Sequence, residues 1–166
     1  MAVRPVLRYP DAVLKRAAEP VGEVTDALRA LAEDLVETMR ASPATVGLAA
    51  PQVGEPVRVF VLDVTGHRRA DTAHGLVALF DPEVLEADDA DVVREGCLSV
   101  PDLTANVRRA RRAVVRGLAP DGSPRRYEMR GFEARALLHE VDHLDGLLIL
   151  DRVAAASDLF PRKVYG

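Results

Sequence analysis

Two histidines in a helical pattern near the end of the chain constrain its fold and chemistry more than any other feature. His139 and His143 are four residues apart, and Glu140 lies between them. Residues four apart project from one face of a helix, so both imidazoles can reach a single ion. A glutamate beside the first histidine can act on water bound to that ion. Two surface histidines on a solvated helix would have the same spacing, so the pattern alone leaves both interpretations open.

Cys97 is the candidate for a third ligand, because catalytic metal sites usually use three protein groups and keep one position for water. It is the only cysteine of the chain and stands in Glu95-Gly96-Cys97-Leu98-Ser99. A lone cysteine cannot form an internal disulfide, so it is either a small buried hydrophobic residue or a thiolate with a function. Composition does not choose between these two.

Apolar periodicity predicts where helices and strands lie. One helix begins at the N-cap Thr25 and ends at Ser42-Pro43, and a second covers residues 131–144. Short strand-like runs follow one another without intervening helices. These runs are Val57–Asp63, Leu76–Asp81, Ala113–Leu118 and Arg125–Met129, with a last one at Leu147–Leu150. This order predicts an α+β fold, with largely antiparallel sheets packed around a central helix that carries the two histidines.

Length and composition predict a single domain over residues 1–166. The 166 residues are 48% hydrophobic and 29% charged, which is typical of one globular domain. Pro5–Pro20 is expected to be an ordered arm on the body, and Val153–Gly166 a short tail. A net charge of -4 argues against a dedicated nucleic-acid binder, so no DNA partner is expected. No apolar run reaches about 18 residues, so we expect a cytoplasmic protein without membrane contact.

Three separated motifs resemble those of the peptide deformylase family. They are Gly47-Leu48-Ala49-Ala50-Pro51-Gln52, Glu95-Gly96-Cys97-Leu98-Ser99 and His139-Glu140-Val141-Asp142-His143, and they occur in the family's order. The resemblance extends to Pro5-Val6-Leu7-Arg8-Tyr9-Pro10-Asp11 and to Leu144-Asp145-Gly146, so it covers nearly the whole chain. Chance does not account for agreement at three separated motifs.

The resemblance implies a metal-dependent hydrolase that removes the formyl group from the N-terminal formylmethionine of newly made proteins and releases formate. One divalent metal ion, iron(II) natively with zinc, nickel or cobalt as alternatives, would be bound by Cys97, His139 and His143. Glu140 would take a proton from the attacking water and return it to the leaving amine. Gln52 and the backbone N–H of Leu98 would stabilise the oxyanion. The partners would be formylmethionyl peptides and nascent chains.

Four further residues are candidates for substrate binding. Phe132 and Ala136 precede His139 by two turns and one turn, so they would line an apolar pocket for the methionine side chain, or else belong to the core. The resemblance implies that the backbone of Val46 and Gly47 binds the extended peptide.

Two positions depart from the family's pattern. Thr45 and Leu138 stand where the family has glycine and glutamine. Neither position supplies a metal ligand, so these departures bear on substrate specificity rather than on the core chemistry.

The charged residues near the site allow more than one interpretation. Asp142 is expected to pair with Arg109, which stands where the family keeps a buried arginine; the alternative is a solvent-facing carboxylate. Arg109 belongs to the one basic cluster, Arg108-Arg109-Ala110-Arg111-Arg112. A weak ribosome contact would explain this cluster, and so would a charged edge strand. His67 and His74 lie in a polar segment and are expected at the surface.

Two other classes of function fit parts of the pattern. Cys97 could be the nucleophile of a metal-free cysteine hydrolase served by a histidine. The site could instead be a structural or sensing metal centre in an inactive relative, although Glu140 would then have no purpose. The sequence does not determine the native metal, the oligomeric state, or whether this is a housekeeping or a specialised copy.

Overall fold

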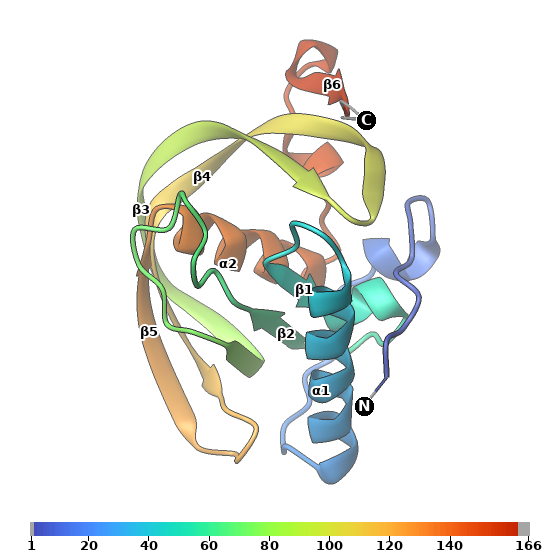
Figure 1. The fold of residues 1–166 in the computed structure, drawn as a ribbon, viewed down its shortest axis with the longest axis vertical. Helices are drawn as coiled ribbons and strands as arrows, with labels where there is room; N and C mark the ends of the chain where they lie inside the picture. Colours follow the sequence, from blue (N-terminus) through green and yellow to red (C-terminus); the bar gives the residue numbers. More distant parts are fainter. Residues whose placement is uncertain (1, 163–166) are drawn as a thin grey trace.

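The computed structural model describes residues 2–162 and combines helices with antiparallel strands, which confirms the expected mixed class (Figure 1). The strands are β1 (Gly47–Ala49), β2 (Val59–Leu62), β3 (Val77–Cys97), β4 (Val100–Leu118), β5 (Pro124–Arg130) and β6 (Leu159–Pro161). The helices are α1 (Asp26–Ala41) and α2 (Phe132–Leu144), with the short 3-10 helices η1 (Ala12–Lys15), η2 (Ala50–Val53), η3 (Ile149–Arg152) and η4 (Ala156–Asp158). The sheet order is β1-β2-β3-β4-β5, and β6 pairs with β4.

Helix α1 forms where its periodicity predicts it. The hydroxyl of Thr25 caps it by accepting a hydrogen bond from the backbone N–H of Leu28 at 3.3 Å. Leu31, Leu35 and Met39 are buried and pack against β1, β2 and η2. Neither α1 nor any other helix within residues 2–162 is long and apolar enough to cross a membrane.

The β3–β4 hairpin is much longer than the sequence indicated. The predicted runs Leu76–Asp81 and Ala113–Leu118 form only its base. The remainder mixes many charged residues with a few apolar ones, of which Ala105 and Val107 are buried. Cross-strand ion pairs stabilise this part. Arg112, for example, lies 2.9 Å from Glu86 and 2.8 Å from Asp88. An acidic segment followed by a basic segment of similar length could have indicated this longer antiparallel pairing.

The Arg108–Arg112 cluster is one stretch of β4. It pairs with β3 on one side. On the other side Arg112 pairs with β5 and the carbonyl of Arg111 accepts a hydrogen bond from the backbone N–H of Gly131, so only residues 108–110 of the cluster have no strand partner there among the described residues. This geometry agrees with the charged-edge interpretation. Within residues 2–162, Arg108 is the one arginine of the cluster without a carboxylate within 4 Å, since Arg111 lies 3.7 Å from Asp89.

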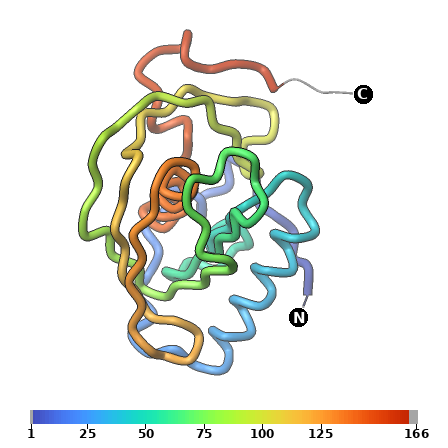
Figure 2. Tube along the Cα trace, turned by 60° about the vertical axis from the view of Figure 1, so that its left-hand side comes forward, coloured from blue at the N-terminus to red at the C-terminus, as the bar shows by residue number. Residues whose placement is uncertain are grey.

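Helix α2 carries the two histidines and contacts β1, β2, β4 and β5. Viewed from a second direction, other segments of the chain lie around it (Figure 2). Leu137 and Leu144 are fully buried in the core that α2 shares with the sheet. Gly146 follows the helix with a φ of 77°, and a Cβ there would lie 2.8 Å from the backbone of Arg16. A glycine is therefore required where the helix was predicted to stop.

The prediction of a strand at Leu147–Leu150 is wrong. The backbone N–H of Leu148 donates to Asp151 Oδ2 at 2.8 Å, and this contact closes the turn of η3. Leu148 and Ile149 are nevertheless buried, because a short apolar run can reach the core without being a strand. The tail expected from Val153 contains η4 and β6, and residues 163–166 of that prediction lie outside the described residues.

The segment Pro5–Pro20 packs on the body, as expected for an ordered arm. Leu14 is fully buried. The backbone N–H of Leu7 donates to the carbonyl of Gln52 at 2.7 Å, and that of Tyr9 donates to the carbonyl of Ser99 at 2.8 Å. The arm therefore connects two of the three sequence motifs.

Candidate metal centre

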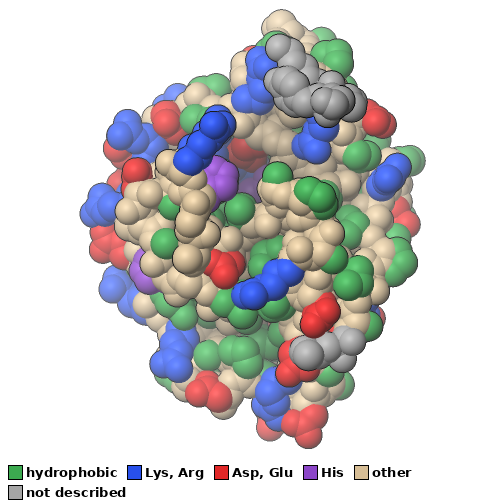
Figure 3. Space-filling view, in the orientation of Figure 1, with side chains coloured by type: hydrophobic (Ala, Val, Ile, Leu, Met, Phe, Trp, Pro, Cys, Tyr) green, Lys and Arg blue, Asp and Glu red, His purple; other side chains and the backbone are tan. Residues whose placement is uncertain are grey.

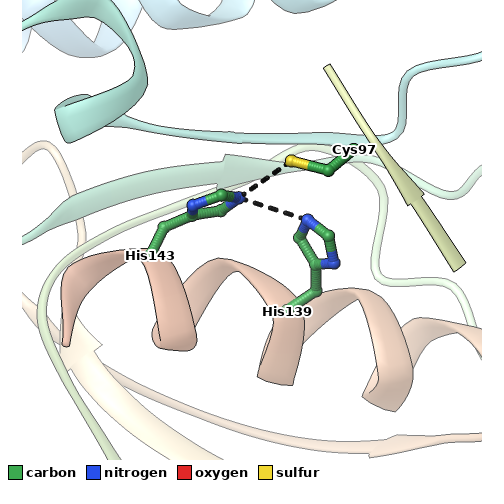
Figure 4. Close-up of side chains that lie close together, drawn as sticks. All are labelled: Cys97, His139 and His143. Atoms are coloured by element: carbon green, nitrogen blue, oxygen red, sulfur yellow. Dashed lines mark hydrogen bonds between the residues drawn. The ribbon is translucent and has the colours of Figure 1, made fainter. Parts of the chain in front are cut away.

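Cys97, His139 and His143 come together in one cluster (Figure 4). Both imidazoles project from α2, and Cys97 lies at the end of β3. The Cys97 Sγ lies 3.4 Å from His143 Nε2, which lies 3.2 Å from His139 Nε2. All three potential ligand atoms lie within 4.8 Å of one another.

The separations of 3.4 and 3.2 Å fit a shared metal ion. Metal–ligand bonds of about 2.0–2.3 Å at tetrahedral angles would place neighbouring donors about 3.3–3.6 Å apart. Burial opposes ionisation of the Cys97 thiol, but His143 and His139 hold its pKa well below the usual value. A thiolate with two imidazoles is a donor set suited to zinc, iron and similar transition metals.

Glu140 lies beside this cluster with a free oxygen. The residue is 3% exposed, and its Oε1 has no hydrogen-bond partner within the described part of the chain. Burial raises the pKa of its carboxyl group. A Cβ on Gly47 would lie 2.6 Å from Glu140 Oε2, so the glycine lets the β1 backbone approach the carboxylate. Because an unpaired buried oxygen is costly, Glu140 is suited to receive a hydrogen bond from a molecule in the pocket.

The amide group of Gln52 is oriented by contacts at both ends. Its Oε1 accepts a hydrogen bond from the backbone N–H of Ala49 at 3.0 Å, and its Nε2 donates to Ser99 Oγ at 3.1 Å. The same Nε2 lies 3.7 Å from Cys97 Sγ. The donor end of Gln52 therefore faces the cluster, and Leu98 lines the same pocket.

Glu95 is a residue of the site to which the sequence analysis gave no role. Its Oε1 lies 3.0 Å from His139 Nδ1, and it accepts hydrogen bonds from Arg109 at 2.7 and 3.0 Å and from Arg135 at 2.6 Å. Burial favours the neutral acid, but His139 and Arg109 lower its pKa to about 2. A charged Glu95 fixes the ring of His139 through the nitrogen that faces away from the cluster. Its position two residues before Cys97 on a strand could have indicated a shared face.

Arg109 and Asp142 make the contact that the sequence analysis expected. Arg109 Nη1 donates to Asp142 Oδ2 at 2.8 Å, and both residues are 5% exposed. Asp142 also accepts hydrogen bonds from Arg152 at 2.9 and 2.6 Å. A solvent-facing Asp142 is therefore excluded, and a chain of buried ion pairs lies behind the histidine side of the cluster.

The residues predicted to bind the peptide line one pocket with Cys97 and His139 of the metal cluster. This pocket has a volume of about 630 Å³ and is visible as a hollow with a histidine at its base (Figure 3). Its lining includes Val46, Gly47, Phe132, Ala136, Cys97, His139 and Glu140. Strand β1 lies at one end of the sheet, so one of its edges has no strand partner within residues 2–162. Such an edge can bind an extended peptide.

The two departures from the family's pattern have different surroundings. Thr45 lines the pocket, and its hydroxyl donates to the carbonyl of Pro43 at 3.3 Å. Leu138 is partly buried and packs against the core around α2. Only the first of these positions can contact a molecule in the pocket directly.

Two histidines on one helix, a cysteine from a neighbouring strand and a buried glutamate at an open pocket define the class of metal-dependent hydrolases. The family model described as polypeptide deformylase matches residues 3–158. The chain belongs to the peptide deformylase family, whose metal-dependent enzymes remove formyl groups from the N-termini of newly made proteins.

Individual relatives cover almost the whole chain. The peptide deformylase of Halothermothrix orenii is 43% identical over 95% of this chain and 98% of its own length. That of Thermodesulfovibrio yellowstonii is 38% identical over 98% and 97%. The crystal structure of the Thermotoga maritima enzyme matches with a TM-score of 0.83 at 37% identity, covering 93% and 100%. An Acinetobacter baumannii deformylase bound to Met-Ala-Ser matches with a TM-score of 0.83 at 34% identity, covering 92% and 99%.

Proposed function

We propose that residues 1–166 act as one catalytic domain, with α2 as its central support, that hydrolyses the formyl group of formylmethionine on nascent chains. The observation that carries this proposal is the unpartnered oxygen of Glu140 in an open pocket that Cys97 and His139, two of the three clustered candidate ligands, also line. The reaction consumes one water and releases formate and a free α-amino group. Because these substrates are made on ribosomes, the proposed location is the cytoplasm.

Cys97, His139 and His143 would hold one divalent ion, and iron(II) is the proposed native metal, with zinc, nickel or cobalt as substitutes. When bound, the ion would polarise the formyl carbonyl and lower the pKa of a water from 15.7 towards about 7. The thiolate contributes negative charge, and Glu95 holds His139 in the orientation that the cluster needs.

Glu140 is the proposed proton carrier. It would accept a proton from the attacking water and deliver it to the amine nitrogen as the C–N bond breaks. Its burial supports this role, because a raised pKa brings a carboxyl group closer to the operating pH of a general base. Its position against Gly47 supports it too, since the β1 backbone that would bind the peptide lies next to the carboxylate.

Gln52 Nε2 and the backbone N–H of Leu98 are the proposed donors to the oxyanion. The contacts with Ala49 and Ser99 hold the Gln52 amide group before substrate arrives, so little reorganisation is needed during the reaction. One such donor typically contributes about 2.7–4 kcal/mol to transition-state stabilisation.

The peptide would lie along the free edge of β1, with Val46 and Gly47 as backbone partners. Phe132 and Ala136 would receive the methionine side chain, which agrees with their position on the pocket wall. The Met-Ala-Ser complex of the Acinetobacter baumannii relative supports a peptide of this kind as the ligand. We also propose a weak ribosome contact through the basic cluster, made mainly by Arg108.

Formate release from formyl-Met-Ala-Ser tests the proposed function. Protein purified anaerobically with iron(II) should release formate, and Glu140→Gln should retain its metal while kcat falls about 10²–10⁴-fold. Metal content measured on the same samples separates loss of the proton carrier from loss of the ion. A Glu140→Gln protein with near-normal turnover would contradict the proposal.

Chelation and alkylation test the cysteine-hydrolase alternative, and formate release by the metal-loaded protein tests the alternative of a structural or sensing metal centre. A metal-free cysteine hydrolase would survive chelation and be inactivated by mild alkylation of Cys97, whereas the proposed enzyme should show the opposite response when its metal is bound. A fully metal-loaded protein that releases no formate would instead favour the structural or sensing metal centre.

A further inference from the structure

Three arginines at the pocket, Arg69, Arg94 and Arg162, have no role in the proposed chemistry. All three are exposed and line the pocket that holds the metal cluster. None has a carboxylate within 4 Å in residues 2–162, whereas many other arginines of this chain are ion-paired. We refer to these three residues as the arginine rim. They come from three separate segments, so their convergence depends on the fold.

Arg69 is carried by a segment that is anchored to the start of α2. The side chain of Glu133 is fully buried and accepts hydrogen bonds from Thr72 Oγ1 at 2.6 Å and from the backbone N–H of His74 at 2.9 Å. His74 Nδ1 also lies 2.7 Å from Glu133 Oε1. His74 is exposed as expected, yet it helps to tie this segment to the body.

A second contact brings the same segment to the pocket wall. The ring of His67 stacks on Phe132, with 4.1 Å between centroids and 18° between planes. His67 Nδ1 accepts a hydrogen bond from the backbone N–H of Arg69 at 3.1 Å. Arg69 therefore projects beside the wall proposed to receive the methionine side chain.

Arg94 and Arg162 belong to the part of the pocket formed by β3 and the segment after β6. The Arg94 guanidinium lies 3.5 Å from the centroid of the Phe160 ring, a cation–π contact that orients it. The backbone N–H of Arg162 donates to the carbonyl of Asp102 at 2.9 Å. A Cβ on Gly96 would collide with the guanidinium of Arg162, so the glycine leaves room for this side chain.

In the described part of the chain, the acidic residues of the pocket do not form ion pairs with the arginine rim. Glu95 and Glu140 line the same pocket, but the charge of Glu95 is already shared by Arg109 and Arg135. Three positive charges thus surround a pocket in a protein whose net charge is -4. These arginines line the pocket that would hold the peptide. The anion that they would meet there is therefore an acidic group of the peptide itself.

We infer that the arginine rim selects formylmethionyl chains that carry an acidic side chain at the second or third residue. This inference rests on the proposed deformylation. Guanidinium groups bind carboxylates through charge-assisted, often bidentate hydrogen bonds, and they repel lysine and arginine side chains. The preference concerns the residues after the methionine, because the methionine side chain itself would enter the apolar part of the pocket.

The test compares kcat/KM for C-terminally amidated peptides, which lack the terminal carboxylate that could also bind the rim. The series is formyl-Met-Ala-Ser, formyl-Met-Glu-Ser, formyl-Met-Lys-Ser, formyl-Met-Ala-Glu and formyl-Met-Ala-Lys. At low ionic strength we expect the glutamate peptide to exceed the lysine peptide about tenfold at one of the two positions, if each exposed pair contributes a few-fold. In about 0.5 M salt the ratio should fall towards one.

Variants assign the preference to the rim. The triple variant Arg69→Gln, Arg94→Gln, Arg162→Gln should bring the glutamate-to-lysine ratio close to one, while Arg94→Lys should keep most of it. Arg108→Gln is the matched control, because it removes an exposed and unpaired arginine outside the pocket and should leave the ratio unchanged.

The outcomes separate the two proposals. Normal formate release from formyl-Met-Ala-Ser with equal rates for the glutamate and lysine peptides would overturn the inference and leave the proposed function intact. An equal ratio change in Arg108→Gln and in the triple variant would also overturn it, because general protein charge would then be the cause. Absence of formate release from every peptide would reject the proposed function itself.

Discussion

Arg109 and Arg112 lie three residues apart on β4 and make similar contacts in opposite surroundings. Arg109 donates three hydrogen bonds, to Glu95 and Asp142. Arg112 also donates three, to Glu86, Asp88 and Glu128. The side chain of Arg109 is 4% exposed and that of Arg112 is 24% exposed.

This difference in burial separates two functions of ion pairs in one strand. Around Arg112, water can hydrogen-bond to each carboxylate if the guanidinium is removed. These pairs therefore help to set the register of a long hairpin but contribute little to the free energy of unfolding. Around Arg109, little water reaches the partners, and each carboxylate shares its charge between Arg109 and one further arginine. The buried pairs also touch His139 through Glu95, which connects them to the metal cluster.

Arg109→Met should have the largest effect on stability. It leaves Glu95 and Asp142 with buried charge that the remaining arginines compensate only in part, and breaking a buried pair typically costs about 3–5 kcal/mol. Urea unfolding followed by circular dichroism, with equal metal loading, measures the loss in free energy of unfolding. Arg112→Met is the matched control, and an equal loss in both variants would remove the distinction between the two regions.

Glu95→Gln should have an intermediate effect, seen in metal binding rather than in the fold. The amide keeps the size of the side chain but loses the charge that orients His139, and losses of this kind typically weaken metal affinity about 10–100-fold. Competition with a chelator measures the affinity. Glu83→Gln, on the exposed part of β3, should bind metal as the unmodified protein does. Unchanged affinity in Glu95→Gln would mean that α2 alone orients His139.

Arg112→Gln should have the smallest effect. Its carboxylate partners are exposed and stay hydrated when the guanidinium is removed, so the free energy of unfolding should stay close to that of the unmodified protein. Any small difference should vanish in about 1 M salt, where charges are screened within about 3 Å. A difference that persists at high salt would show that Arg112 contributes by packing.

The sequence predicted those parts of the fold that bury a regular apolar face. Helix α1 followed from leucines and a methionine at helical spacing, and α2 from its apolar stripe and Gly146. The part of β3–β4 beyond the predicted runs buries only a few small apolar residues, such as Ala105 and Val107, among many charged ones, so its apolar pattern was too weak to predict two long strands. The prediction of a strand at Leu147–Leu150 was wrong for the opposite reason: the run is apolar and buried, but burial alone does not specify a strand.

For the site, short-range spacing carried more information than composition. The four-residue spacing of His139 and His143 and the Glu-Gly-Cys-Leu-Ser motif nominated the residues that the structure brings together. The arginine rim could not be predicted in this way. Arg69, Arg94 and Arg162 share no motif, and they meet only because an anchored loop and a terminal strand approach the same pocket.

The N-terminal arm has a consequence for the time course of folding. Its backbone binds Gln52 in η2 and Ser99 in the turn between β3 and β4. The backbone N–H of Ala18 also donates to the carbonyl of Leu144 at the end of α2. The contacts that complete the site also join distant parts of the chain, with sequence separations of 45 positions for Gln52 and Cys97 and 46 for Cys97 and His143. Such separations raise the entropic cost of loop closure before any contact compensates for it, and folding slows as contacts become less local. The cluster should therefore form late, when the first and last parts of the body are already available to meet.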